Sequence, residues 1–445
     1  MKPSDVSSFA SPDLGVNAAP VRLGLAGLGT VGSGLARLLA GNRDWIRRRV
    51  GRDMVLKTVL VRDLGKPRDA ALGPDTVLTT RPTDLTADPD IDIVVELMGG
   101  TGAAYALIRD ALTAGKHVVT ANKALLAERG PELFALAGQK GLGLLYEASV
   151  AGAIPIVQTL KESLAANRIE SLIGILNGTA NYILTRMSDK GLTFGEALKK
   201  AQEKGYAEAD PTLDIEGLDA AHKLVLLIRL AYGENYPLSR LPVQGITRVT
   251  PVDIRFAAEF GYVIKLIGQV RRVGDRLDAG VCPMLVHTDY LLANVQGAFN
   301  AIRLEGDASG PMLLHGKGAG GLPTASAVAA DILSLARPGP CPNNTGFLEE
   351  PLPEADILDP DEAVCRHFIR FNVEDRAGVM AAISKVMGEE GVSIYQAVQK
   401  GDPETGFVPI VFLTHAAPVR AVRRVIEAVD AMPFLRPETV HYRVL

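Results

Sequence analysis

The stretch that decides the fold of the first part of the chain is residues 21–32, Val-Arg-Leu-Gly-Leu-Ala-Gly-Leu-Gly-Thr-Val-Gly. Its first six residues form an apolar run typical of a buried strand in a parallel sheet. The next six follow the pattern Gly-x-Gly-x-x-Gly, and leucines with helical spacing come directly after them. The stretch therefore predicts a strand, a tight turn and a helix in succession, as in the first unit of a doubly wound parallel sheet.

The glycines of this turn suggest a ligand. They permit a sharp bend and let a pyrophosphate approach the N-terminus of the helix, where N–H groups favour anions. A glycine-rich turn without a ligand is the alternative, and the strand–turn–helix context favours binding. We therefore expect a dinucleotide to be held by five residues of the turn: Gly27, Gly29, Thr30, Val31 and Gly32.

The end of the next predicted strand, Val55–Val61, bears on which dinucleotide is bound. An acid at this place favours the ribose hydroxyls of NAD, whereas an arginine accommodates the 2′-phosphate of NADP. Arg62 comes first here and Asp63 second. This order favours NADP and leaves NAD open, while Lys66 and Arg68 are more simply explained as solvated loop cations.

Strands alternating with helices continue this nucleotide-binding domain over residues 21–150. Ligands of such a sheet lie at the carboxyl ends of its strands. Gly99 and Thr101 belong to a second glycine-rich turn at one of these ends, and Lys123 follows another, where it could meet both cofactor and substrate. The further strands expected are Ile91–Leu97, His117–Thr120 and Gly143–Glu147.

The second domain, residues 151–322, has the pattern of an α+β substrate domain. It begins with a loop of small residues near Glu147. The backbone carbonyls of this loop could hold a hard monovalent cation, although a plain connection is the simpler interpretation. A strand at 169–176 then leads into Asn177-Gly178-Thr179. Polar side chains at this point could cap the next helix or hold a substrate carboxylate.

Residues 205–223 are the most strongly acidic part of this domain. Pro211 keeps the acid-bearing loop out of a helix, and Asp219 and Lys223 share one face of the helix that follows. Such a pair is usually a solvated surface ion pair. The acids of the loop nevertheless suit a small zwitterionic substrate, and the remainder of the chain favours that function.

The rest of the second domain predicts an open sheet usable for dimerisation, followed by a glycine-dense loop. Gly318 and Gly320 lie in this loop, which is typical of backbone that approaches a ligand. A helix at 323–337 is expected to return the chain to the nucleotide domain. The elements expected before it are a helix from Phe256 to Lys265 and antiparallel strands at 270–273 and 277–286.

A proline-rich segment and a third domain complete the chain. Residues 338–362 have the composition of a linker. Residues 363–445 follow the order β-α-β-β-α-β, which is the ferredoxin-like split motif. This domain offers no candidate nucleophile or metal cluster, which favours a binding or regulatory role.

Bulk properties exclude several classes of protein. The chain has 445 residues, of which 47% are hydrophobic, as is ordinary for a globular protein. Its net charge of −4 gives no electrostatic reason to expect nucleic acid or an anionic membrane as partner. It lacks a transmembrane-length apolar run and a signal peptide, and residues 1–20 are expected to form a disordered tail. Three scattered cysteines indicate neither disulfides nor a zinc site, so a cytoplasmic location is expected.

Taken in order, the quoted stretches resemble one family, homoserine dehydrogenase with a C-terminal ACT domain. The resemblance covers nearly the whole chain after residue 20. It implies reversible, NADP(H)-dependent reduction of L-aspartate 4-semialdehyde to L-homoserine, with NAD(H) also possible. It also implies a role in threonine, methionine and isoleucine synthesis, feedback control by threonine, and a homodimer or homotetramer.

The resemblance also implies roles for individual residues. Lys223 becomes the general acid/base and Asp219 its positioning partner, since a lysine ammonium can supply the proton that an alkoxide needs. The substrate contacts implied are Glu208, Asp214, Lys123, Thr179 and Gly178. The sodium site implied consists of Glu147 and the carbonyls of Val150, Gly152 and Ile154. The effector turn implied contains Asp375, Gly378 and Val379.

Two rival functions are compatible with part of this pattern. Another NADP-dependent oxidoreductase, such as an aspartate dehydrogenase, would share the first domain, but the constellation from Glu208 to Lys223 argues against it. A catalytically inactive amino-acid sensor would share the third domain. The intact Lys223, Asp219 and Lys123 argue against that function.

Overall fold

The computed structural model describes residues 19–68, 70–348, 351–400 and 406–445. The described chain forms two compact units, which are treated separately below. The first contains the residues up to Ser149 and the segment that begins at Gly320; the second contains Val150–Ala319 and the segment from Pro351 onward. The predicted tail lies outside the described residues, except for its last two.

The first unit is built on a six-stranded parallel sheet with the order β3-β2-β1-β4-β5-β6, which confirms the predicted doubly wound fold. Apolar side chains of β1 and β4, such as Leu23, Leu25 and Val95, are fully buried in its core. The strands are β1 Val21–Ala26, β2 Met54–Leu60, β3 Val77–Thr79, β4 Ile93–Glu96, β5 His117–Thr120 and β6 Leu144–Leu145.

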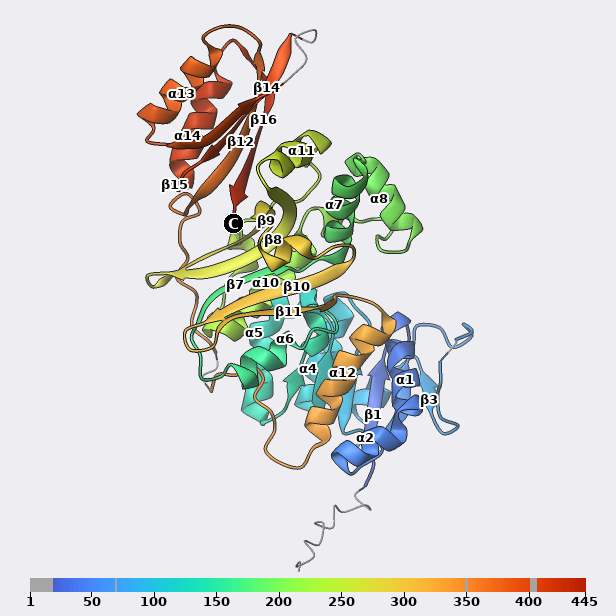
Figure 1. Cartoon of the computed structure of the whole chain (residues 1–445). Helices are drawn as coiled ribbons and strands as arrows, with labels where there is room; N and C mark the ends of the chain where they lie inside the picture. The colour runs from blue at the N-terminus through green and yellow to red at the C-terminus, as the bar shows by residue number, and fades with distance from the viewer. Residues whose placement is uncertain (1–18, 69, 349–350, 401–405) are drawn as a thin grey trace, which may run out of the picture. The chain divides into compact units, whose positions relative to one another are not determined.

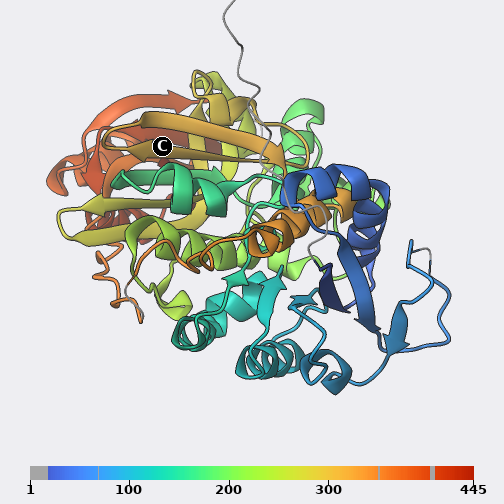
Figure 2. The ribbon, with the colours of Figure 1, turned by 90° about the horizontal axis from the view of Figure 1, so that it is seen from below.

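Helices cover this sheet, and the late helix α12 is one of them. It packs against α1, so residues nearly 300 positions apart share one core (Figure 2). The helices are α1 Thr30–Gly41, α2 Arg43–Val50, α3 Thr83–Thr86, α4 Gly102–Thr113, α5 Lys123–Lys140 and α12 Gly321–Ala336, with the 3₁₀ turn η1 Glu147–Ser149.

The second unit is built on one mixed sheet with the order β11-β10-β7-β8-β9-β16-β12-β14-β13. Helices α7 and α10 pack against its first strands, where the predicted catalytic residues lie. The strands of this first part are β7 Ile169–Ile175, β8 Tyr262–Val273, β9 Arg276–His287, β10 Phe299–Gly306 and β11 Gly310–Lys317. Its helices are α6 Ile156–Gln158, η2 Thr159–Ser163, α7 Gly178–Lys190, α8 Phe194–Glu203, α9 Thr212–Ile215, α10 Leu218–Tyr232, η3 Leu238–Arg240, α11 Pro251–Glu259 and η4 Leu291–Asn294.

The predicted helix from Phe256 to Lys265 is wrong in its second half. Helix α11 ends at Glu259, and Gly261 with φ of 81° turns the chain into β8, which begins at Tyr262. Aromatic and β-branched residues from Tyr262 onward fit a pleated, buried strand better than a helix. The predicted antiparallel pairing with β9 is present and runs from Tyr262–His287 to Val273–Arg276.

The C-terminal domain forms the other end of this sheet. Helices α13 and α14 lie together on one face of its strands and enclose a separate apolar core (Figure 1). Strand β16 also pairs in parallel with β9, through Arg443 with Met284 and Val444 with Leu285. The elements are β12 Val364–Glu374, α13 Val379–Glu389, β13 Ile394–Gln399, β14 Phe407–Thr414, β15 Ala417–Pro418, α14 Val419–Asp430 and β16 Leu435–Val444.

The second half of the proline-rich segment is held by backbone hydrogen bonds. Asn235 N donates to Pro353 O at 2.7 Å and Leu277 N donates to Asp356 O at 2.8 Å. The side chains of Leu352 and Leu358 are buried. This part of the predicted linker is therefore packed on the second unit. Across the described residues, no helix combines the length and the apolar character needed to cross a membrane.

Candidate functional site

Lys223 lies at the centre of a buried polar network in the second unit. It is one turn after Asp219 on α10, and its Nζ donates to Asp219 Oδ2 at 2.6 Å and to the Leu176 carbonyl at 2.7 Å. Both side chains of the pair are only 9% exposed. The alternative of a solvated surface pair is therefore wrong for this site, and burying two charges requires the strong, hydrogen-bonded pairing observed.

Asn177 connects this pair to a second carboxylate. It is the N-cap of α7, and its Oδ1 accepts from Ala180 N at 2.7 Å. Its Nδ2 donates to Asp219 Oδ2 at 2.8 Å and to Asp214 Oδ1 at 2.6 Å. Two acids from separate helices, α9 and α10, thus meet at one amide group.

The environment of Asp214 makes its carboxyl a weaker acid than usual. Burial raises the pKa of this carboxyl, and the nearby charge of Asp219 adds to the rise, whereas hydrogen bonding to Asn177 opposes it. A carboxyl with a raised pKa thus shares the Asn177 amide with a buried ion pair. The structure thus brings Asp214, Asp219 and Lys223 together, as the sequence predicts.

Three further predicted substrate residues, Thr179, Gly178 and Glu208, belong to this unit. Thr179, at the start of α7, donates from Oγ1 to Tyr206 O at 2.8 Å. Gly178 has no room for a side chain, because a Cβ would lie 2.7 Å from the Ala298 carbonyl oxygen. Glu208 is exposed on the loop before α9, and its carbonyl accepts from Gln202 Nε2 at 3.1 Å.

Sequence reasoning missed Asn300 and the Leu176 carbonyl as parts of this site. Asn300 is fully buried on β10, and its Nδ2 donates to Leu176 O at 3.0 Å, the same oxygen that accepts from Lys223. A side chain at Gly318 would collide with the Asn300 amide, so the glycine-dense loop closes on this residue. A lone asparagine in a strand carries no signal of its position, whereas Asn177 stood in a polar turn that marked it.

The glycine turn in the first unit has the form that a pyrophosphate needs. Gly27 has φ of 100°, and a Cβ there would lie 2.5 Å from the Leu97 carbonyl oxygen. Helix α1 begins at Thr30, and its N-cap Gly29 makes no side-chain cap. The first N–H groups of α1 therefore lack a side-chain acceptor, which favours binding of an anion by this turn and by the adjacent Val31 and Gly32.

Glu96 organises the second glycine-rich turn and was not predicted. This fully buried carboxylate ends β4 and accepts from Met98 N at 2.7 Å, Gly99 N at 3.1 Å and Thr120 Oγ1 at 2.7 Å. Asn122 Nδ2 in turn donates to Gly100 O at 2.7 Å and its Oδ1 caps α5, whose first residue is Lys123. Thr101 ends the same turn as the N-cap of α4.

The strand end that bears on cofactor choice presents Arg62 to solvent. The neighbouring Asp63 is engaged in its own loop, since its Oδ1 accepts from Gly65 N at 2.8 Å. Arg68 donates to the carbonyls of Asp63 and Lys66. Both Arg62 and Asp63 are exposed at this strand end.

The residues predicted for sodium lie in both units. Glu147 belongs to the first unit, whereas Val150, Gly152 and Ile154 belong to the second. In the second, Gly152 has φ of 59° and the preceding Ala151 has φ of 53°, an unusual conformation for a residue with a side chain. Within the described ranges, no group of three or more His, Cys, Asp or Glu side chains is arranged to hold a metal ion.

The predicted effector residues lie on one turn of the C-terminal domain. Asp375 follows β12, and its Oδ1 accepts from Gln399 Nε2 on β13 at 3.2 Å. Gly378 is the N-cap of α13 with φ of 94°, and Val379 is the first residue of that helix and is buried.

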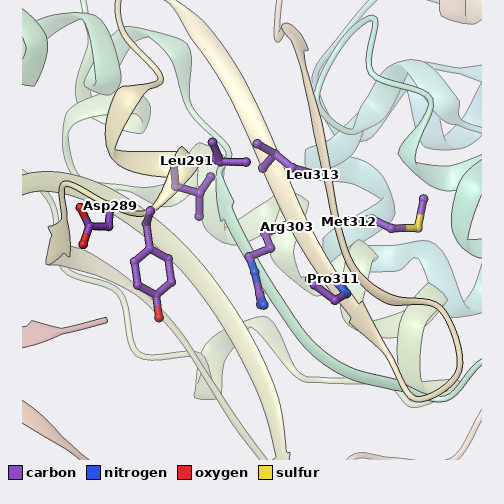
Figure 3. Close-up of a pocket in the computed structure, with 8 residues that line it drawn as sticks. Asp289, Leu291, Arg303, Pro311, Met312 and Leu313 are labelled. Carbon is purple, nitrogen blue, oxygen red and sulfur yellow. The ribbon is translucent and has the colours of Figure 1, made fainter.

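One pocket in the second unit lies apart from all these residues. It has a volume of about 380 Å³, and Arg303 on β10 points into it beside apolar side chains of β11 and η4 (Figure 3). None of the predicted site residues lines it. Its lining residues are Asp289, Tyr290, Leu291, Leu292, Arg303, Pro311, Met312 and Leu313.

Comparison with known families matches three parts of the chain. Residues 27–147 match the model for the homoserine dehydrogenase NAD-binding domain, residues 155–333 the model for homoserine dehydrogenase, and residues 367–431 the model for the ACT domain. The matches cover the glycine turn, the Lys223 network and the predicted effector turn respectively.

Individual proteins similar to this chain are named as members of the same family. A homoserine dehydrogenase from Neisseria gonorrhoeae is 41% identical over 95% of this chain and 99% of its own length. A crystal structure of the enzyme from Thiobacillus denitrificans has a TM-score of 0.90 and 43% identity, over 96% of this chain and 98% of that one. A hyperthermophilic archaeal homoserine dehydrogenase in complex with NADPH is 28% identical with a TM-score of 0.60, over 71% of this chain and 97% of that one. The chain therefore belongs to the homoserine dehydrogenase family, and it is a nicotinamide-dependent oxidoreductase with a C-terminal ACT domain.

Proposed function

We propose that this chain interconverts L-aspartate 4-semialdehyde and L-homoserine with Lys223 as the general acid/base. The observation that carries the proposal is the buried Lys223–Asp219 pair, with Nζ and Oδ2 only 2.6 Å apart. A lysine held at one point by a carboxylate and a carbonyl presents its amine in a defined direction. General acid–base catalysis requires such fixed geometry.

The proton steps follow from this geometry. When the aldehyde is reduced, the Lys223 ammonium donates a proton to the carbonyl oxygen as that oxygen gains negative charge. When homoserine is oxidised, neutral Lys223 accepts the hydroxyl proton. Asp219 orients the amine and stabilises its charged form. A bound nicotinamide supplies or accepts the hydride in these two directions.

The substrate and a cation would be held by the residues around this network. We assign the substrate ammonium to Glu208, and we assign Asp214, Thr179, Gly178 and Lys123 to the lining of the same pocket. Sodium would be held by the carbonyls of Val150, Gly152 and Ile154 with Glu147. These carbonyls lie in and beside a turn where Ala151 and Gly152 both have positive φ.

For the cofactor we propose NADP, with NAD accepted less well. Support comes from the exposed Arg62 at the end of β2 and from the similar archaeal enzyme whose structure contains NADPH. The phosphates would lie on the turn from Gly27 to Gly32, with Gly99, Thr101, Gly318, Gly320 and Lys123 as further contacts.

Regulation and assembly complete the proposal. We infer that threonine binds the turn containing Asp375, Gly378 and Val379, since the ACT domain is a module that suggests an amino-acid effector. We further infer a cytoplasmic homodimer or homotetramer. The biosynthetic role would be in the synthesis of threonine, methionine and isoleucine.

The decisive experiment compares homoserine oxidation by the wild type and Lys223→Ala, with NADP and NAD in parallel. The variant should lose most of kcat, roughly 100-fold or more, and still bind NADPH. Lys385→Ala is the matched control, because Lys385 forms an exposed i, i+4 pair with Glu389, and it should retain full activity. Near-normal turnover by Lys223→Ala would remove Lys223 from the mechanism. If the folded wild type binds NADPH but oxidises homoserine with neither cofactor, the chain is instead an amino-acid sensor.

A further inference from the structure

The network around Lys223 contains one neutral side chain that contacts both of its acids. Asn177 is 4% exposed, and it lies between β7 and α7 with Asp214 on one neighbouring helix and Asp219 on another. Three hydrogen bonds, two from its NH₂ group and one to its oxygen, hold the Asn177 amide in one orientation. The oxygen accepts from a backbone N–H, and the NH₂ group faces two carboxylates.

This orientation is fixed by chemistry. Rotating the amide by 180° would direct its oxygen at two carboxylate oxygens and its NH₂ group at the Ala180 N–H, and all three contacts would become repulsive. The two N–H bonds of the amide therefore point permanently at Asp214 and Asp219. The oxygen of Asp219 that Asn177 contacts is also the oxygen that binds Lys223 Nζ.

We propose that Asn177 is a positioning residue for the reaction: by holding the Asp214 and Asp219 carboxylates, its amide sets the orientation of Lys223 and the pH range in which Lys223 exchanges its proton. This inference rests on the proposed role of Lys223. Without the two N–H donors, the carboxylates would be less well compensated and would hold the ammonium form of Lys223 to higher pH.

The competing explanation is that Asn177 serves only as a helix cap. Asparagine, aspartate and serine are about equally good N-caps, because each offers one oxygen to the backbone. A cap alone therefore does not need the NH₂ group. The two explanations separate in variants that keep the oxygen and lose the two N–H donors.

Asn177→Asp and Asn177→Ser are such variants. Both can still cap α7, but both should lower the melting temperature, because buried carboxylates lose two hydrogen bonds; circular dichroism checks that each variant is folded before it is assayed. Both should lose kcat for homoserine oxidation by roughly tenfold or more, because hydrogen bonds to charged groups are lost. The acid limb of the kcat–pH profile should move upward, by about one pH unit in Asn177→Asp, which adds a negative charge, and by less in Asn177→Ser.

Thr193→Ala is the matched control, because Thr193 caps α8 through its side chain and is exposed. This variant should lose some stability and keep the wild-type kcat and pH profile. If Asn177→Asp does not fold, Asn177→Ser carries the test, since it adds no charge. Folded Asn177 variants with wild-type kcat and an unmoved acid limb would overturn the inference.

The Lys223→Ala assay separates this failure from failure of the proposed function. An inactive Lys223→Ala together with normal Asn177 variants would reject only the positioning role. An active Lys223→Ala would reject the acid/base assignment itself, and any effect of Asn177 would then have another cause.

Discussion

Burial decides what the Asp219–Lys223 pair can do. On a solvated helix the same spacing contributes only about 0.3–0.5 kcal/mol and has no further consequence. Here both side chains are shielded from water, and the Leu176 carbonyl and the Asn177 amide complete their hydrogen bonding. Two charges removed from water interact strongly, so small changes in their neighbours should alter the proton affinity of the amine.

At the strand end of the first unit, one substitution should alter cofactor choice. Arg62→Asp removes the cation proposed to meet the 2′-phosphate and replaces it with a negative charge. We expect kcat/KM for NADP to fall roughly tenfold or more, since a charge-assisted hydrogen bond contributes about 1.5–3 kcal/mol, with little change for NAD. Steady-state kinetics with both cofactors measures the ratio.

The control for this prediction is Arg81→Ala. Arg81 is an exposed arginine of the same unit that pairs with Asp84 within one helical turn. Its removal should leave the NADP to NAD ratio unchanged. An unchanged ratio in Arg62→Asp as well would mean that other residues bind the phosphate.

Among the elements, those whose sequence carries a local signal could be predicted. The strand–turn–helix at residues 21–32 encodes its own fold, and the β-α-β-β-α-β order of the C-terminal domain follows from alternating patterns. The segment after Glu259 could be predicted only in part, because Tyr262–Lys265 is apolar enough for either a helix or a strand. The pairing of β16 with β9 joins residues about 160 positions apart and leaves no trace in local pattern.

The same distinction applies to the site. The spacing of Asp219 and Lys223 placed them on one face of a helix, and the family resemblance supplied their roles. The contact of Asn177 with Asp214 depends on how α7, α9 and β7 pack. The sequence therefore marked each residue as a polar position, but it did not show that the two side chains are in contact. Asn300 and Glu96 are buried polar residues in strands whose roles depend on distant backbone groups.

One contact between elements should be important for stability. Asp253 is fully buried, completes the capping box of α11 and pairs with Arg370 of β12 at 2.6 Å. Arg370→Met would leave this carboxylate without its cation. We expect a loss of about 3–5 kcal/mol in the free energy of unfolding, measured by urea denaturation, because an isolated buried charge is costly.

Arg276→Met provides the comparison for this loss. Arg276 pairs with Glu362 at 2.9 Å, but both side chains are 42% exposed. Its removal should change the free energy of unfolding by about 1 kcal/mol or less. Equal effects of the two substitutions would contradict the importance assigned to burial at Asp253.

For the whole molecule, the continuous sheet of the second unit links the C-terminal domain to the strands that carry the site. A buried pair of histidines lies near this junction. His367 Nε2 donates to the Ala417 carbonyl at 2.9 Å, so in the neutral ring Nδ1 carries no proton. His367 Nδ1 therefore accepts from His441 Nε2, at a distance of 2.9 Å. This arrangement uses two neutral rings, which are buried away from water, and protonating both would direct two N–H groups at each other.

This pair should make the enzyme sensitive to acid. Burial, with the nearby His367 and Arg443, lowers the pKa of His441 from 6.5 to about 3. Between pH 6.5 and 3 the unfolded chain therefore binds more protons than the folded one. The contribution of neutral His441 to stability is fully present above pH 6.5 and is lost as the pH falls toward 3. The free energy of unfolding of the wild type should fall between pH 7.5 and pH 5. In His441→Gln this fall should be smaller by about 1–2 kcal/mol. Urea titrations at both pH values measure it, and a loss equal to that of the wild type would reject the role of His441.

The continuity of the sheet also determines how threonine control should be tested. Deleting residues 361–445 should abolish threonine sensitivity, but it would also remove β16 from β9 and Arg370 from Asp253. Loss of activity in that truncation would then reflect damage to the second unit. Point substitutions in the effector turn avoid this difficulty.

Asp375→Ala and Gly378→Ala are suitable substitutions. The first removes a carboxylate from the turn, and the second forces a side chain into a backbone with φ of 94°. Both should raise the threonine concentration for half-maximal inhibition roughly tenfold, as expected for loss of one charged contact or a distorted turn. Uninhibited kcat should stay at the wild-type level, and Glu389→Ala, on the exposed side of α13, should leave inhibition unchanged. A wild-type threonine response in both turn variants would place the effector site elsewhere in the chain, and a wild type that ignores threonine would leave the C-terminal domain with another ligand or a structural role.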